Sequence, residues 1–402
     1  LPRAAQVEDP RRRGLTPVPA SRPSGPYFED SANQISLASG LAFTIERQGT
    51  SEFLDRDEVQ AGGVLFVRPG PRTLRQVSGT RLTAYDSQTG DIRWQRGRTD
   101  DASDVLASVR FLSPPIAVSD QRWVSYLQGS DLHVAALRPA DGALLKQALI
   151  GSVREPAQDR GQIPQREPVT PLTLHEGVVY VPTGVGAVSA IDVSGMQVRW
   201  TFVYDSQSGG RRRADAPAAW IASPPIVESG VVVVTATDYE EVLGIDAATG
   251  AHRWTASVDG CSYPIAAHRG KVWLGGQKIV ALSLADGREL WGSKLAGTPT
   301  GKAALCGDQI HVPVSTGLIT LDAQTGNHLS VQELPASQAP LGNIACVGSS
   351  LYSLEPSSVR KFPDLDRMHE TATHQLQANP NDIAAVIRLA WSELLRGQAR
   401  AA

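Results

Sequence analysis

The stretch that decides the fold is Ala84-Tyr85-Asp86-Ser87-Gln88-Thr89-Gly90-Asp91-Ile92-Arg93-Trp94. It recurs as Gly244-Ile245-Asp246-Ala247-Ala248-Thr249-Gly250-Ala251-His252-Arg253-Trp254, and its first part returns as Thr320-Leu321-Asp322-Ala323-Gln324-Thr325-Gly326. Looser copies end in Trp200 and Trp291, and a weaker one contains Asp141-Gly142. A phrase that returns in this way indicates an array of one supersecondary unit.

Each copy predicts a strand, a turn and a second strand. The Asp side chain accepts hydrogen bonds from backbone N–H groups a few residues on, and the Gly supplies the positive φ that other residues resist. The tryptophan follows four residues after the Gly in three copies, and five after Gly195 in the copy that ends at Trp200. The residues to which we assign the turn are Asp86 and Gly90, Asp246 and Gly250, and Asp322 and Gly326.

Short β-branched runs such as Val231-Val232-Val233-Val234 stand before the turns and favour strands. The later copies are spaced at roughly 40 residues, which is the size of a four-stranded propeller blade. We therefore predict an all-β fold, a seven-bladed β-propeller of four-stranded antiparallel blades. An eighth blade is the alternative, because Gly63-Val64-Leu65-Phe66-Val67 in the insertion over about 49–80 also resembles a strand.

Composition and sequence pattern divide the chain into three parts. Residues 1–32 are rich in Pro and Arg and predict an extended arm. Residues 33–370 contain the propeller, and residues 371–402 form a helical tail. Apolar residues at three-to-four spacing predict an amphipathic helix over about 381–396.

The charge and the cysteines exclude several classes of protein. A net charge of −3 argues against a surface that binds nucleic acid throughout, and no apolar run is long enough to span a membrane. Three cysteines cannot make a disulfide scaffold. Cys306 and Cys346 stand one repeat apart, so either a disulfide between them or two buried thiols is expected, without a preference.

The Asp-x-x-Thr-Gly-x-x-x-Trp phrase and the Ser223-Pro224-Pro225-Ile226 lead-in resemble the repeat of PQQ-like (quinoprotein-type) β-propellers. That family includes quinoprotein alcohol dehydrogenases and the outer-membrane assembly lipoprotein BamB. The resemblance implies that the tryptophans wedge neighbouring blades together, a blade-locking role for Trp94, Trp200, Trp254 and Trp291. The region around Asn379-Pro380-Asn381-Asp382 resembles the first helix of a tetratricopeptide repeat.

The resemblance also bears on chemistry. Enzymes of the family hold the quinone under an adjacent pair of cysteines, and this chain has neither that pair nor a Cys-x-x-Cys-His haem motif. We therefore expect no enzyme activity and no cofactor, with no metal site among the scattered histidines. A PQQ-dependent dehydrogenase and a small-ligand sensor that uses the propeller channel are the alternatives.

The expected function is a non-catalytic scaffold that binds other proteins in an extracytoplasmic bacterial assembly. We expect it to lie in the periplasm or cell envelope and not to bind nucleic acid. Its contacts should come from insertions over about 49–80, 152–166 and 205–218, because loops on a rigid scaffold usually carry binding. Arg211, Arg212 and Arg213 form the candidate interaction loop. The acidic stretch Asp238-Tyr239-Glu240-Glu241 is expected to be solvated.

Overall fold

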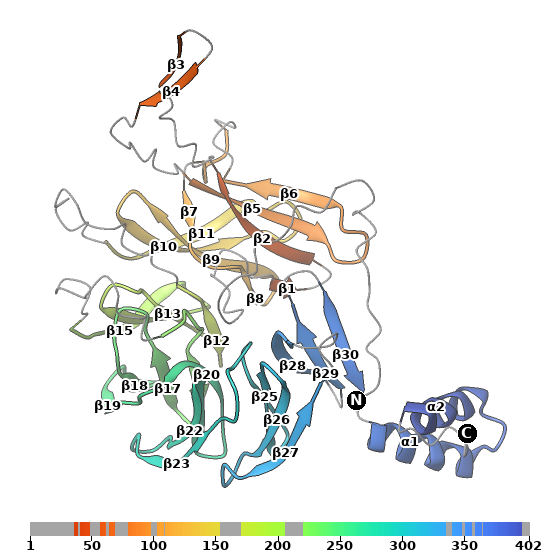
Figure 1. Ribbon diagram of the computed structural model, residues 1–402. Coiled ribbons are helices and arrows are strands. Elements are labelled where there is room, and N and C mark those ends of the chain that lie inside the picture. The colour runs from red at the N-terminus through yellow and green to blue at the C-terminus, as the bar shows by residue number, and fades with distance from the viewer. Residues whose placement is uncertain are drawn as a thin grey trace. The chain divides into compact units, whose positions relative to one another are not determined.

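The computed structural model describes residues 36–38, 41–48, 57–61, 64–68, 79–97, 103–107, 109–152, 170–205, 220–334, 340–347, 350–355, 358–363 and 365–395. The strands in these residues form seven blades and one separate hairpin, and helices follow only at the C-terminal end (Figure 1). This confirms the predicted seven-bladed β-propeller. The chain divides into two compact units, Glu29–Thr255 and Leu1–Phe28 with Ala256–Ala402.

The first unit contains four blades. Within each blade, strands that follow one another in sequence pair antiparallel, except that β7 and β8 both pair with β9. The strands are β1 (Ser36–Ala38), β2 (Leu41–Gln48), β5 (Gly79–Asp86) and β6 (Ile92–Arg96) in blade 1; β7 (Arg110–Phe111), β8 (Ile116–Val118), β9 (Gln121–Gln128), β10 (Asp131–Leu137) and β11 (Leu144–Ser152) in blade 2; β12 (Thr173–His175), β13 (Val178–Pro182), β14 (Ala187–Asp192) and β15 (Gln197–Val203) in blade 3; and β16 (Ile226–Glu228), β17 (Val231–Thr235), β18 (Val242–Asp246) and β19 (His252–Ala256) in blade 4.

The second unit contains three blades and two helices. The seventh blade has three strands among the described residues, where four were expected. Its third strand ends at Pro363 and helix α1 begins at Leu365, so the chain leaves the sheet early. The strands are β20 (Cys261–His268), β21 (Lys271–Gly276), β22 (Lys278–Ser283) and β23 (Glu289–Lys294) in blade 5; β24 (Ala304–Cys306), β25 (Gln309–Val314), β26 (Gly317–Asp322) and β27 (His328–Glu333) in blade 6; and β28 (Asn343–Val347), β29 (Ser350–Leu354) and β30 (Val359–Pro363) in blade 7.

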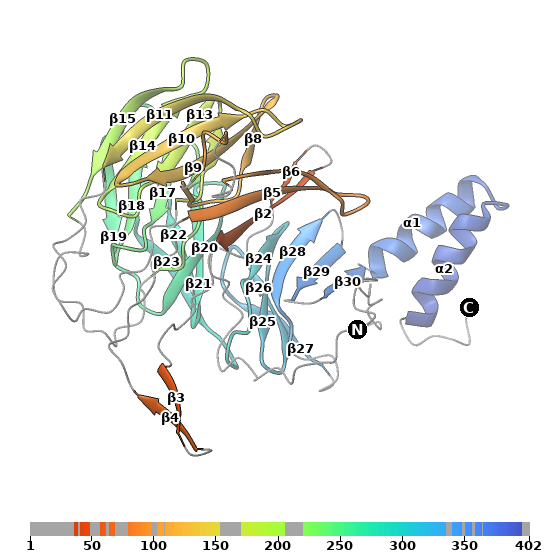
Figure 2. The same cartoon turned by 90° about the horizontal axis from the view of Figure 1, so that it is seen from above.

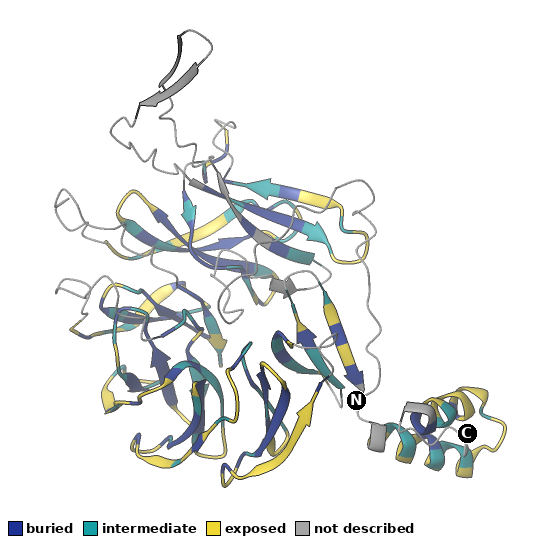
Figure 3. Ribbon diagram, viewed as in Figure 1, coloured by how far each residue is buried: buried dark blue, intermediate teal, exposed yellow. Residues whose placement is uncertain are grey.

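The hydrophobic core lies between neighbouring blades. Every residue of β13 and of β17 is buried, because each strand sits in the middle of a sheet that is covered on both faces (Figure 3). One cluster joins Phe43 and Leu82 of blade 1 to Tyr126 of blade 2. The continuous Val-rich runs of the sequence reflect this two-sided burial.

The stretch considered for an eighth blade belongs to a hairpin instead. Strand β4 (Val64–Arg68) pairs with β3 (Asp57–Ala61), and these two strands form a sheet of their own. Both lie in the connection between β2 and β5 of blade 1.

The C-terminal region contains a pair of helices where one was expected. Helix α2 (Ile383–Leu395) corresponds to the expected helix, and Asp382 caps it by accepting a hydrogen bond from the Ala385 N–H at 3.0 Å. Helix α1 (Leu365–Ala378) precedes it and begins ahead of residue 371. Its sequence is mostly polar, with Leu365, Met368 and Leu376 as its large apolar residues, so it lacks the dense apolar spacing from which α2 was predicted. Within the described residues, neither helix is long and apolar enough to cross a membrane.

Candidate protein-interaction site

The connections between strands lie at the two opposite ends of the strands in each blade, because neighbouring strands are antiparallel and follow the sequence order. An edge here means one of these two ends and not an outermost strand of the sheet. Short turns join the first strand to the second and the third to the fourth at one edge, which we call the turn edge. Connections from the second strand to the third, and from one blade to the next, start at the other, the insertion edge. The segments that follow Gln48, Ser152 and Asp205, which contain the three predicted insertions, all start at insertion edges.

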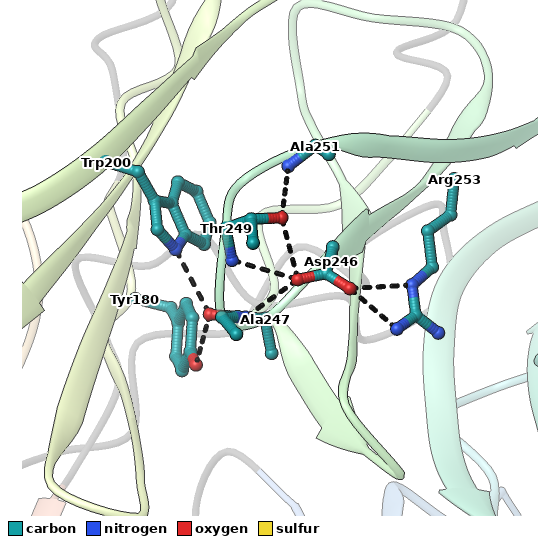
Figure 4. Close-up of polar contacts among 8 residues, drawn as sticks. Tyr180, Trp200, Asp246, Ala247, Thr249, Ala251 and Arg253 are labelled. Carbon is teal, nitrogen blue, oxygen red and sulfur yellow. Dashed lines mark hydrogen bonds and ion pairs between the residues drawn. The ribbon is translucent and has the colours of Figure 1, made fainter.

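The repeated phrase forms the turn edge, as Figure 4 shows for blade 4. One oxygen of Asp246 accepts hydrogen bonds from the Thr249 N–H at 2.9 Å and the Thr249 hydroxyl at 2.8 Å. The other accepts two from the Arg253 guanidinium, at 2.7 and 3.2 Å. The Gly250 N–H donates to the Asp246 carbonyl with φ at 74°. The turn is thus closed by the side chain and the backbone of one aspartate.

The same turn recurs with one additional residue that the sequence reading had missed. Arginine seven residues after the aspartate pairs with it in three blades, as Arg93 with Asp86, Arg199 with Asp192 and Arg253 with Asp246. The signal was present, since each of these arginines immediately precedes the phrase's tryptophan. In blade 6, Asp322 makes the turn and Leu329 stands at the arginine position.

These contacts stabilise the ionised carboxylates. Hydrogen bonds from the Thr89 N–H and from Arg93 lower the pKa of Asp86 to about 2. The Arg253 guanidinium and the Thr249 N–H hold the pKa of Asp246 far below its usual range, and Ser194 with Arg199 does the same for the pKa of Asp192.

Blade 3 shows that the turn position need not be glycine. Met196 takes the left-handed conformation there, with φ at 54°, and Gly195 does not. Alignment on Met196 restores the four-residue spacing, from Asp192 to Met196 and from Met196 to Trp200. The apparent five-residue spacing measured from Gly195 was therefore a misalignment of the sequence copies.

Three of the phrase's tryptophans lie on the turn of the following blade. A Cβ added to Gly142 would come within 2.6 Å of Trp94, and one added to Gly250 would come equally close to Trp200. Trp291 lies on Gly326 in the same way. Trp254 is 5% exposed and lies over Gly244 of β18 in its own blade. Only a residue without a side chain fits beneath these indoles.

The indole N–H groups find their partners differently from blade to blade. Trp94 donates to the Pro139 carbonyl at 2.8 Å, and Trp200 donates to the Ala247 carbonyl at 3.1 Å (Figure 4). At the junction of blades 5 and 6, Trp273 of β21 donates to the equivalent Ala323 carbonyl at 2.9 Å. Among the described residues, the buried Nε1 of Trp291 has no hydrogen-bond partner.

At the insertion edge, Asp238 holds the junction of blades 3 and 4. The Tyr204 hydroxyl donates to one carboxylate oxygen at 2.8 Å, and the Gly186 N–H donates to the other at 2.7 Å. Asp238 is 9% exposed, so the expectation that it is solvated was wrong. Burial and the Asp238 charge raise the pKa of Tyr204 far above its ordinary value, which keeps its hydroxyl proton as a donor.

The segment between β17 and β18 also binds Trp220, the first described residue after the third predicted insertion. The Trp220 indole, 1% exposed, donates to the Glu240 carbonyl at 2.8 Å, and the rings of Tyr204 and Tyr239 lie 5.3 Å apart. Tyr204 and Trp220 flank the predicted insertion, so both of its ends are fixed on the segment between β17 and β18. Arg211, Arg212 and Arg213 lie outside the described residues.

The structure shows the state of each cysteine and how the metal-ligating side chains are arranged. Cys306 of β24 and Cys346 of β28 form a disulfide, with their Cα atoms 5.9 Å apart, so the first of the two alternatives holds. Cys261 is a buried free thiol, and burial raises its pKa to about 12. Within the described residues, no three His, Cys, Asp or Glu side chains gather into a possible metal site.

The blades, the aspartate turns and the tryptophans that lie on the next blade define a β-propeller of the PQQ-like class. Residues 47–216 and 163–328 match the family described as outer membrane protein assembly factor BamB, and the chain belongs to that family. No curated protein matches this sequence in the comparison.

Three solved structures show different degrees of similarity to this chain, and only the first supports the fold. BamB from Moraxella catarrhalis is similar with a TM-score of 0.50 and 18% sequence identity, over 84% of this chain and 97% of that chain. The computationally designed Ika8 protein has a TM-score of 0.39 and 11% identity, over 82% of this chain and 95% of that one. A quinohemoprotein alcohol dehydrogenase from Pseudomonas putida HK5 has a TM-score of 0.38 and 17% identity, over 55% and 41%.

Proposed function

We propose that this chain is a non-catalytic scaffold of the bacterial cell envelope that binds a partner protein of an outer-membrane assembly through the insertion edge of its four-blade unit. The observation that carries the proposal is the fixation of Tyr204 and Trp220 on the segment around Asp238. A binding segment whose two ends are fixed has less conformational entropy to lose on association than one with free ends.

The chemistry of that loop suggests what it binds. Arg211, Arg212 and Arg213 place three cations between the two fixed ends. Guanidinium groups recognise carboxylates in a planar, two-point geometry, so an acidic surface on the partner is favoured. The family description, outer membrane protein assembly factor, supports a protein partner.

Two observations support an envelope location. The Cys306–Cys346 disulfide suits an oxidising compartment such as the periplasm. The same family description refers to the outer membrane.

The loop is tested by replacing Arg211, Arg212 and Arg213 together with alanine. Affinity capture from native membranes, followed by titration of the captured partner after purification, should show a loss of about tenfold or more in affinity, as two or more charged contacts imply. Arg138→Ala is the matched control, because Arg138 is 53% exposed but lies at a turn edge of the same unit. Equal affinity for the triple variant and the control would refute the proposed loop.

The dehydrogenase alternative has its own experiment. PQQ and calcium are added to the purified chain, unbound quinone is removed, and the absorbance of bound chromophore is recorded with a dye-reduction assay for several alcohols. We expect neither bound quinone nor dye reduction. Stoichiometric quinone uptake with dye reduction would replace the scaffold proposal by an enzyme.

A further inference from the structure

The third strand of blade 7 is an outermost strand among the described residues. Strands β28, β29 and β30 lie side by side, and the chain then enters α1 (Figures 1 and 2). Val359 of β30 is 45% exposed and Lys361 is exposed as well (Figure 3). By contrast, the third strands β14 and β22 are buried at their four central residues. The side of β30 away from β29 therefore lacks the cover that a fourth strand gives in other blades.

The backbone of β30 directs two amide groups to that side. In the hairpin that joins β29 to β30, the Glu355 N–H donates to the Ser358 carbonyl at 2.9 Å. Hydrogen-bonded pairs alternate along an antiparallel ladder, so the N–H of Arg360 points to β29, and those of Val359 and Lys361 point away from it. A strand that joins the blade would bind at these two residues.

The preceding blade differs from the others in a way that matches. Three of the phrase's tryptophans lie on the turn between the third and fourth strands of the following blade. In blade 6 the tryptophan position, four residues after Gly326, is Ser330. Blade 7 makes no turn of this kind, because β30 ends at Pro363 and α1 begins at Leu365. A fourth strand therefore has to come from another part of the chain.

We propose that residues 15–20 of the N-terminal arm are this fourth strand, antiparallel to β30. Leu1–Phe28 belongs to the same compact unit as blade 7. The connection also has a suitable length. Residues 21–35 would lead from the added strand to β1, and they are intermediate in number between residues 257–260, which join β19 to β20, and residues 204–225, which join β15 to β16.

The sequence of residues 15–20, Leu-Thr-Pro-Val-Pro-Ala, suits an outermost strand. Alternate residues of an extended chain direct their N–H groups to the same side. Pro17 and Pro19 therefore leave one side without donors, whereas Val18 and its even-numbered neighbours keep theirs on the other. Proline is accepted in a sheet where its side of the strand faces solvent, and it also prevents pairing with a further chain. The even-numbered residues would thus face β30.

Amide hydrogen exchange of the whole chain, resolved to single residues, tests this strand. We expect the amides of Val359 and Lys361 to exchange slowly, and Val18→Pro, which removes the central N–H, to speed both by about tenfold or more. Val7→Pro is the matched control, because it places a proline elsewhere in the arm, and it should leave both amides protected. The amide of Arg360 should stay protected in every variant, which shows that blade 7 is folded.

Deletions locate the segment. Removal of residues 1–14 should leave Val359 and Lys361 protected, whereas removal of residues 1–20 should expose them. Fast exchange of these two amides in the unsubstituted chain would overturn the proposal, because that side of β30 would be open. Protection that survives the removal of residues 1–20 would overturn it as well, since another strand would cover β30. Dependence of that protection on protein concentration would identify the other strand as part of a second copy.

Discussion

The indole of Trp200 lies directly on Gly250 of the next blade, where a Cβ would approach it to 2.6 Å. Gly250 also has a φ of 74°, so a side chain there meets both steric and backbone resistance. This single contact joins the third blade to the fourth through the signature that the sequence repeats.

Gly250→Ala should lower the free energy of unfolding by more than the strain of a side chain at positive φ accounts for, because the added Cβ also meets Trp200. Gly177→Ala is the control, because Gly177 has a φ of 75° and no described residue lies within 4 Å of an added Cβ. The control should lose about 1–2 kcal/mol for the left-handed backbone, and Gly250→Ala about 1–3 kcal/mol more for the overpacked indole. Chemical denaturation measures both. Equal losses would mean that the Trp200 contact contributes nothing.

The tryptophans should differ when each is changed to phenylalanine. Trp200→Phe removes a hydrogen bond to the Ala247 carbonyl, whereas Trp291→Phe removes an N–H that has no partner in the described part of the chain. We expect Trp200→Phe to cost about 1 kcal/mol more in the free energy of unfolding than Trp291→Phe. A greater loss at Trp291 would contradict the assignment of Trp273 as the donor at that junction.

Acid should remove the contribution of the aspartate turns. The pKa of Asp246 is lowered in the folded chain, so its stabilising effect is complete above the unfolded pKa near 3.8 and is lost as the pH falls further. Thermal melts from pH 7 to pH 2 should show Asp246→Asn less stable than the unsubstituted chain at neutral pH, with the difference shrinking below about pH 4. A difference that stays constant across this range would show that the ionised carboxylate is not responsible. Asp120→Asn, in the exposed turn after β8, controls for the change of net charge.

Tyr204→Phe should destabilise the insertion edge. The change leaves a buried Asp238 oxygen without its hydroxyl donor, which costs about 1–3 kcal/mol. Tyr239→Phe is the comparison, because its hydroxyl donates to Glu241 in a half-buried setting and its loss should cost less. If Asp238 positions the proposed binding loop, Tyr204→Phe should also weaken partner binding, measured by the same titration at a temperature where the variant is folded. Unchanged stability of Tyr204→Phe would show that the Tyr204–Asp238 hydrogen bond does not stabilise the insertion edge.

Reduction should loosen the three-blade unit. The disulfide joins β24 to β28, which are 40 residues apart in sequence. Closing a loop of that size contributes about 2–4 kcal/mol. Cys306→Ser with Cys346→Ser should match the reduced unsubstituted chain in denaturation, and a reducing agent should leave the double variant unaffected. A double variant as stable as the oxidised chain would show that the disulfide does not stabilise the three-blade unit.

Much of the fold could be read from local pattern. Within one blade the strands follow one another in sequence, so each Asp-to-Gly turn and its flanking strands are encoded in about a dozen neighbouring residues. The candidate site was harder to predict from the sequence. The insertions were found by their length, but Asp238 looked like any acidic loop residue until the fold buried it beneath Tyr204.

The sequence by itself determined the repeating strand–turn–strand unit, the class of fold and the glycine at most of the turns, because these depend on backbone conformation within a single segment. Only the tertiary structure decided that Met196 takes the turn position in blade 3, that Trp273 supplies the N–H at the junction of blades 5 and 6, and that Cys306 bonds Cys346. The last two depend on which side chains meet across blades, and contacts between distant segments leave no local period in the sequence.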